Sequence, residues 1–187
     1  MILSLLLLMS VTANVLQVLK IRSMQEPLHR CAEMVFHRGA MPHSNVGAPA
    51  AALKVHDLAG KPVELNVARS GKFTVLYVFS PQCGWCRRNS PNMKALMQGA
   101  GPRYDFVPIS LTSDGVAEYM AKLGVSGAVY VDPAVETRNA YGFGSTPQTI
   151  IVGSDGKIAK DWPGAYQGTL LADVSSTLGV HLPGVDN

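Results

Sequence analysis

The sequence predicts an α/β fold in which a central mixed β-sheet is flanked by helices, with an N-terminal transmembrane helix ahead of it. Three observations predict it. Strand and helix patterns alternate along residues 46–187. Phe73 to Phe79 form a continuous apolar run, which is typical of a strand buried on both faces. Ile2 to Leu19 are almost entirely apolar, and 187 residues suffice for one ordinary domain with such an appendage.

Residues 1–20 are predicted to be a membrane anchor. A helix over residues 2–19 would rise about 27 Å, close to the ~30 Å core of a bilayer. A cleaved signal peptide remains an alternative, because Val11-Thr12-Ala13 resembles a small-residue cleavage site, although no basic residue precedes the apolar run. A buried amphipathic helix is disfavoured by the nearly unbroken run. The basic residues just after the span would keep the following domain in the cytoplasm.

Residues 21–45 form a predicted connector, and the globular domain spans residues 46–187. The connector has helical spacing over 23–36 and then several glycines and prolines. Cys31 lies in it and is read as a small apolar residue, with an intermolecular disulfide as the alternative. His29, His37 and His43 share the connector with three methionines, but their spacing is irregular, so no metal site is predicted.

The predicted elements of the domain follow from apolar periodicity and turn residues. Strands are expected at 52–58, 62–65, 73–79, 104–111, 128–131, 149–152 and 157–160. Helices are expected at 84–98, from a cap within 112–114 to 123, from 132 to 141, and at 167–178. Ala59-Gly60-Lys61 and Ser154-Asp155-Gly156 predict two hairpins. Asp132-Pro133 reads as a helix cap followed by proline at the first helical position, and Gly179 ends the last helix.

Composition excludes several classes of function. Charged residues make up 16% of the chain, the net charge is +3, and no basic run exceeds Arg87-Arg88, so no nucleic-acid partner is expected. Three cysteines are too few for a disulfide-built scaffold or a four-thiolate zinc site. No glycine-rich phosphate loop is present, so no cofactor is predicted.

The strongest chemical signal is Cys83-Gly84-Trp85-Cys86, where the buried strand meets the next predicted helix. Unpaired N–H groups and a partial positive charge at a helix N-terminus would stabilise a thiolate at Cys83. The thiolate is the attacking species in disulfide exchange, and Cys86 follows about one helical turn later, near enough to resolve a mixed disulfide. Arg87 and Arg88 could add positive charge, depending on where their side chains point.

Other uses of the two cysteines fit less well. Zinc would need a second cysteine pair or suitably spaced histidines, haem attachment would need histidine where Arg87 stands, and a peroxidatic cysteine would need proline where Leu76 stands. A second feature is Pro147, which precedes an apolar strand. It either starts the strand or forms a cis peptide bond, and the residues alone leave both open.

Three segments in chain order resemble the TlpA/ResA-like branch of the thioredoxin superfamily: LKVHDLAGKPVEL, FTVLYVFSPQCGWCRRNSP and STPQTIIVGSDGKI. The resemblance covers about residues 46–180, and the apolar N-terminus also resembles that of MauD, an accessory redox protein of methylamine utilisation. It implies a thioredoxin-like fold with Cys83 as the exposed nucleophile and Cys86 as the buried resolving thiol.

The resemblance also implies a substrate-binding surface and a location. Gly84, Trp85, Thr146 and a cis Pro147 would contact the substrate, with the Thr146 backbone pairing with a bound strand. The redox domain would lie outside the cytoplasm, which conflicts with the charge distribution noted above. Two family positions differ here, since Tyr77 replaces a buried Asp and Asn89 replaces an active-site Glu. We therefore expect slower proton exchange at Cys86.

The predicted function is that of a thiol-disulfide oxidoreductase. It would act on protein thiols or disulfides through the CGWC pair, together with a redox partner protein, and would be bound to a membrane through residues 2–19. The alternative is a non-enzymatic adaptor or copper-delivery chaperone that uses the same thiols as ligands.

Overall fold

A computed structural model of the chain describes residue 17 and residues 45–68, 71–124 and 127–185. Within these residues, seven strands form one sheet in the order β2-β1-β5-β4-β3-β6-β7. The strands are β1 (Leu53–His56), β2 (Pro62–Leu65), β3 (Phe73–Phe79), β4 (Tyr104–Ser110), β5 (Tyr130–Val131), β6 (Gln148–Val152) and β7 (Ile158–Pro163). The helices are α2 (Gly84–Arg88), α3 (Ser90–Gly99), α4 (Val116–Leu123), α5 (Val135–Tyr141) and α6 (Gly168–Leu178).

The sheet is mixed, as predicted. Strand β3 pairs in parallel with β4 and antiparallel with β6, and β4 pairs in parallel with β5. Both predicted hairpins are present, because β1 pairs antiparallel with β2 and β6 pairs antiparallel with β7. The predicted strands are therefore confirmed, although only β2 and β3 keep the predicted bounds; β4 and β6 differ by one residue, and β1, β5 and β7 by more. Strand β3 is central, and its carboxyl end leads into the Cys83 loop.

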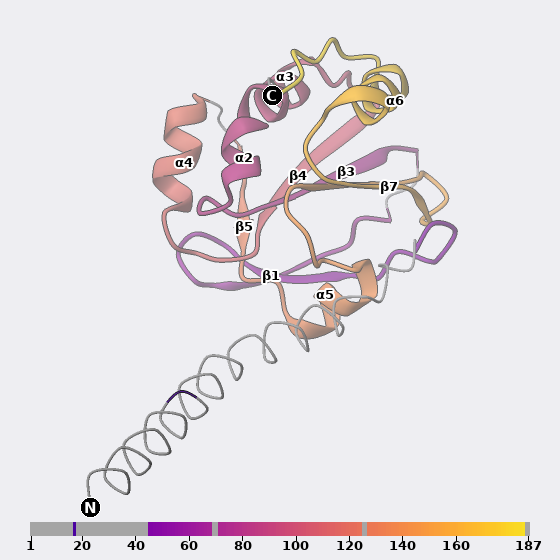
Figure 1. Cartoon of the computed structure of the whole chain (residues 1–187). Coiled ribbons are helices and arrows are strands. Elements are labelled where there is room, and N and C mark those ends of the chain that lie inside the picture. Colours follow the sequence, from indigo (N-terminus) through magenta and orange to yellow (C-terminus); the bar gives the residue numbers. More distant parts are fainter. Residues whose placement is uncertain (1–16, 18–44, 69–70, 125–126, 186–187) are drawn as a thin grey trace, which may run out of the picture. The chain divides into compact units, whose positions relative to one another are not determined.

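Two hydrophobic cores cover the two faces of the sheet. Alternate residues of β3 point to opposite sides: Val75, Tyr77 and Phe79 join the core under α2, α3, α4 and α6, whereas Leu76 and Val78 join the core under α5. Figure 1 shows α5 across the sheet from α3 and α6. A strand buried on both faces was predicted from this apolar run, and the structure confirms it.

The helix predicted over residues 84–98 is wrong in one respect, because it is two helices broken at Asn89. Pro91 lies in the first turn of α3. A continuous helix would need the N–H of residue 91 to donate to the carbonyl of Arg87, and proline has no N–H. The Ser90 hydroxyl donates to that carbonyl instead, at 2.7 Å. The break turns Asn89 into the interior behind the cysteine pair.

Two other predicted helix starts are corrected. Helix α4 is capped by Gly115, with φ 72°, rather than by a side chain within 112–114. Helix α5 begins after Ala134, so Pro133 is not its first residue. Asp132 has φ 49°, and its carbonyl oxygen lies 3.2 Å from Nδ1 of His56 on β1. Asp132 therefore belongs to a turn with a left-handed backbone, two residues before the Ala134 cap, and does not itself cap the helix.

The predicted anchor and connector fall outside the described residues, apart from Gln17 and Asn45. Cys31 and the connector's histidines and methionines are among the residues left out. Within the described part of the chain, no helix combines the length and apolar character that crossing a bilayer requires. The anchor therefore stays a prediction.

Candidate active site

The two cysteines lie at the junction of β3 and α2. Cys83 is the N-cap of α2 and has extended backbone angles, φ −73° and ψ 120°. Its sulfur accepts a hydrogen bond from the backbone N–H of Cys86, with an N to Sγ distance of 3.4 Å. Cys83 is partly exposed, Cys86 is fully buried, and both are free thiols. The sulfur of Cys83 therefore receives the first-turn N–H that the sequence predicted for it.

The Thr146–Pro147 loop faces this cysteine from the start of β6. The peptide bond between these residues is cis, as the family resemblance implies, and Pro147 is buried. The thiol of Cys83 donates to the carbonyl oxygen of Thr146 at 3.2 Å. The structure thus brings Cys83, Cys86 and the Thr146–Pro147 loop together, although the loop is about 60 residues away in the chain.

The environments of the two thiols push their pKa values apart. At Cys83, partial burial opposes ionisation, but hydrogen bonds from the Thr146 side chain and from N–H groups of the helix outweigh it, so the pKa is lowered. The Thr146 carbonyl favours only the protonated thiol, so the thiolate is stabilised by the Thr146 side chain and by the N–H groups of Cys86 and Trp85. Burial, with the neighbouring Cys83, raises the pKa of Cys86 to about 12. Cys83 is therefore the more readily ionised thiol of the pair.

We expect Cys83 to be alkylated by iodoacetamide faster than free cysteine at pH 7, because its lowered pKa leaves more of it as thiolate. In a Cys86→Ser variant, the alkylation rate should rise with pH and level off at a lower pH than for cysteine itself. With Cys31 replaced by serine in both proteins, a Cys83→Ser variant should stay almost unreactive over the same range, since Cys86 is buried. A midpoint for Cys83 at or above that of free cysteine would contradict the assignment.

The two arginines of α2 point to different partners. Arg87 turns back over the loop, and its Nη1 donates to the carbonyl oxygens of Pro81 and Gln82 at 3.0 and 3.1 Å. Arg88 lies over the indole ring of Trp85, with its guanidinium carbon 5.0 Å from the ring centroid. Trp85 is 48% exposed, so the stacked pair lies on the surface. Arg87 thus secures the loop before Cys83, whereas Arg88 stays at the surface.

A buried polar network lies behind Cys86, and the sequence reasoning did not find it. Asn89 donates from Nδ2 to the Tyr77 hydroxyl at 2.9 Å. Its Oδ1 accepts from Nδ2 of Asn92 at 2.8 Å and from the backbone N–H of Tyr166 at 3.0 Å. Tyr77 and Asn89 were singled out only as the two departures from the family pattern. The structure shows that they are hydrogen-bonded to each other.

Tyrosines complete the surroundings of the buried thiol. The Tyr119 hydroxyl of α4 donates to the Cys86 carbonyl oxygen at 3.1 Å, and the Tyr166 and Thr149 hydroxyls share a short hydrogen bond. Burial raises the pKa values of these tyrosines and of Tyr77 well above their ordinary range. They are therefore neutral at physiological pH. For Tyr119 and Tyr166, the sequence carried no signal beyond simple packing.

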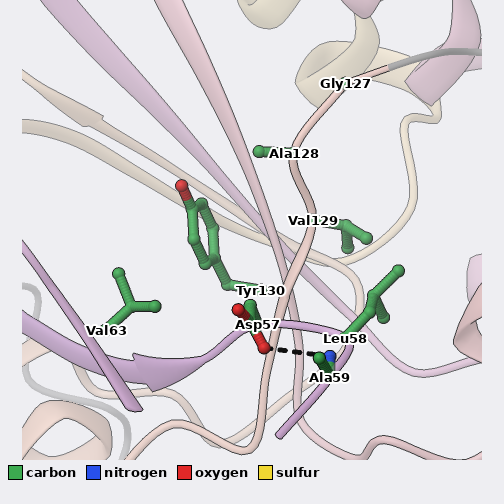
Figure 2. A pocket seen from close by; sticks show the side chains of 8 residues that line it. All are labelled: Asp57, Leu58, Ala59, Val63, Gly127, Ala128, Val129 and Tyr130. Atoms are coloured by element: carbon green, nitrogen blue, oxygen red, sulfur yellow. Dashed lines mark hydrogen bonds between the residues drawn. The ribbon is translucent and has the colours of Figure 1, made fainter. Parts of the chain in front are cut away.

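Other candidate sites are weaker. Among the described residues, no group of three or more histidine, cysteine, aspartate or glutamate side chains is arranged to hold a metal ion. A hollow of about 460 Å³ lies between the β1–β2 turn and the segment leading into β5. Figure 2 shows its lining residues, from Asp57 on the turn to Tyr130 on β5, and neither cysteine is among them. The chemistry-bearing residues therefore gather at the carboxyl end of β3.

Known proteins similar to this chain include thiol-disulfide exchange proteins. Residues 46–161 match the AhpC/TSA family. Over 118 residues the chain is 28% identical to the thiol-disulfide oxidoreductase ResA of Geobacillus thermodenitrificans, covering 62% of this chain and 67% of that protein. Over 123 residues it is 31% identical to the thiol:disulfide interchange protein CycY of Rhizobium leguminosarum, covering 64% and 63%. The chain thus spans about two thirds of the length of one of these curated relatives and slightly less of the other.

Solved structures establish the fold. A thiol:disulfide interchange protein of the thioredoxin family from Chlorobium tepidum aligns with a TM-score of 0.55 at 20% identity, covering 70% of this chain and 94% of that one. The thioredoxin domain of a thiol-disulfide oxidoreductase from Bacteroides vulgatus aligns with a TM-score of 0.54 at 20% identity, covering 71% and 97%. The predicted thioredoxin-like fold is therefore confirmed for the globular domain.

Proposed function

The chain belongs to the AhpC/TSA family, and from that premise we propose that it is a thiol-disulfide oxidoreductase that acts on protein thiols through Cys83 and Cys86. One observation carries the proposal. The sulfur of Cys83 accepts the N–H of Cys86 while it faces the Thr146 carbonyl, so a partly exposed thiol with a lowered pKa sits beside a buried one. The names of the ResA and CycY relatives support the same chemistry.

The exchange proceeds in two displacements. The Cys83 thiolate attacks one sulfur of a substrate disulfide, a new S–S bond forms, and the second substrate sulfur leaves with the electron pair and takes up a proton. Cys86 then loses its proton and attacks the sulfur of Cys83, which releases the first substrate sulfur as a thiolate. The substrate has gained two electrons and the protein holds a Cys83–Cys86 disulfide. The reverse sequence oxidises a substrate dithiol.

Proton transfer from Cys86 uses no carboxylate in this scheme. The groups that act on its pKa are burial, Ser80, Cys83 and Thr146. The departing substrate thiolate or water therefore takes the proton of Cys86. In the mixed disulfide, Cys83 carries no negative charge. Its electrostatic repulsion, which raises the Cys86 pKa, is then removed. Formation of the mixed disulfide by Cys83 thus makes it easier for Cys86 to lose its proton.

Reduction of insulin disulfides tests the proposed activity. With dithiothreitol as the electron donor, the wild-type protein should accelerate insulin precipitation, and a Cys83→Ser variant should fall to the uncatalysed background because the attacking thiol is gone. Equal inertness of the wild type and the variant would reject the proposal. Stoichiometric binding of Cu(I) by such an inert protein would favour a copper-delivery role instead.

The proposed setting is a membrane surface. Residues 2–19 would anchor the chain, and the redox domain would lie on the extracytoplasmic side, where disulfides persist. The apolar run supports the anchor, and the resemblance to the TlpA/ResA-like branch supports the orientation. A reporter enzyme that works only in the cytoplasm can be fused after Asn187. Activity of that reporter would reject this orientation.

A further inference from the structure

Given the proposed thiol–disulfide exchange, on which this inference rests, we propose that Trp85 and Arg88 select protein substrates with an acidic residue close to the reactive cysteine. The two side chains form one surface, here called the Trp85–Arg88 face. Trp85 follows Cys83 by two residues, and Arg88 follows Trp85 by one helical turn. The face therefore borders the thiol that a substrate must reach.

The charge on this face is not neutralised by the protein. No acidic residue occurs between Glu64 and Asp105 in the sequence, and α2 and α3 have none in their first turns. In the described part of the chain the ion pairs are Lys72–Asp105, Lys122–Glu118 and Lys160–Asp173, none of which involves α2. The charged side chains of α2 itself are therefore all basic.

The two arginines of α2 divide structural and surface roles between them. Arg87 uses its guanidinium on the carbonyls of Pro81 and Gln82. Arg88 makes no side-chain hydrogen bond to any residue that the structure describes, and it is exposed. Stacking on the indole holds the guanidinium in place without using its N–H donors, so the donors remain open to a carboxylate. Preorganisation of this kind lowers the entropy lost when a substrate binds.

The reach of the Trp85–Arg88 face sets where the acidic residue of a substrate must lie. Arg88 follows Cys83 by five residues, which corresponds to a rise of about 7.5 Å along a helix. An extended substrate strand covers that distance in two or three residues at ~3.3 Å each.

The chemical partner is thus a protein with Asp or Glu two or three residues from the cysteine that is attacked. Three disulfide peptides of one sequence, with Glu, Gln or Lys at that position, test the inference through their second-order exchange rates at low salt. The wild type should prefer Glu over Lys by about fivefold, since an exposed charge pair contributes about 1 kcal/mol or less. High salt should reduce that ratio toward one.

Arg103 offers a matched control for Arg88. Its guanidinium also lies over an aromatic ring, that of Tyr104 at 5.8 Å, but at the start of β4, the opposite end from the cysteines. The Glu-to-Lys rate ratio should invert in Arg88→Glu and stay that of the wild type in Arg103→Glu. Comparing ratios within each variant cancels any change in the folded fraction.

The possible outcomes separate the inference from the function. Equal rates for all three peptides with the wild type, or an equal shift of the ratio in both variants, would overturn the selection of acidic partners while leaving the oxidoreductase activity in place. Absence of exchange above background with every peptide, including the neutral one, would overturn the proposed function and the inference together.

Discussion

Replacing Cys86 with serine should leave the protein covalently joined to its substrate through Cys83. The variant keeps the backbone N–H of residue 86 that donates to the Cys83 sulfur, so the first attack is retained. A serine hydroxyl cannot displace a disulfide at neutral pH, so resolution depends on thiols from solution. A well-oriented neighbour acts at an effective concentration of about 10⁵ M or more, so turnover should fall at least about a thousandfold. Non-reducing electrophoresis and intact-mass measurement should show a one-to-one adduct.

The matched variant for this experiment is Cys83→Ser. With Cys31 replaced by serine in both variants, it should form no adduct, because the thiol of Cys86 is fully buried and has a pKa raised to about 12. In the wild type, the adduct should be longest-lived at low pH, since Cys86 must lose a proton before it attacks. An adduct on Cys83→Ser, or near-normal turnover by Cys86→Ser, would reverse the assigned roles.

The architecture could be predicted because its signals are local. The run from Phe73 to Phe79 indicated a doubly buried strand, and the turn at residues 154–156 indicated the β6–β7 hairpin. The helix boundaries were less predictable. The break before α3 had a visible cause in Pro91, which the sequence reasoning did not use. The late start of α4 had no such signal, because Thr112 uses its hydroxyl on Gln82, on the cysteine loop, rather than on the helix.

The candidate site divides in the same way. Cys83 and Cys86 were found because the helix cap and the resolving thiol lie three residues apart. The resemblance placed Pro147 beside them, whereas spacing alone left its geometry open. Asn89 and its partners could not be found from spacing, since all of the network's hydrogen bonds except Asn92–Asn89 join residues 12 to 92 positions apart.

That network provides hydrogen-bond partners for Tyr77 and Asn89, at the two positions where the resemblance implies acids. A lone buried carboxylate needs charge compensation, whereas an amide can both donate and accept. Asn89 donates to Tyr77 and accepts from Asn92 and from the Tyr166 backbone, and thereby ties α3 to β3 and to the segment before α6. The Cys86 thiol is left beside neutral groups, which agrees with its high pKa.

Replacing Asn89 with leucine should therefore lower the free energy of unfolding by about 3–5 kcal/mol. Leucine has a similar volume but makes none of the three hydrogen bonds, and each buried polar group left unpaired costs about 1–3 kcal/mol. Asn92 keeps its two hydrogen bonds to the backbone of Gly184, so most of the loss arises at the Tyr77 hydroxyl and the Tyr166 N–H. Urea unfolding monitored by tryptophan fluorescence measures this change in unfolding free energy.

Ser90→Ala is the neighbouring control for Asn89→Leu. It also deletes one side-chain hydrogen bond, from Ser90 to the Arg87 carbonyl, but water can reach that carbonyl once the hydroxyl is gone, because the bond lies at the exposed break between α2 and α3. We expect a loss of about 1 kcal/mol or less. If both variants lost the same small amount of unfolding free energy, the hydrogen bonds of Asn89 would contribute no more than a surface contact. Burial of Tyr77 and Cys86 alone would then have to stabilise the region behind the thiol pair.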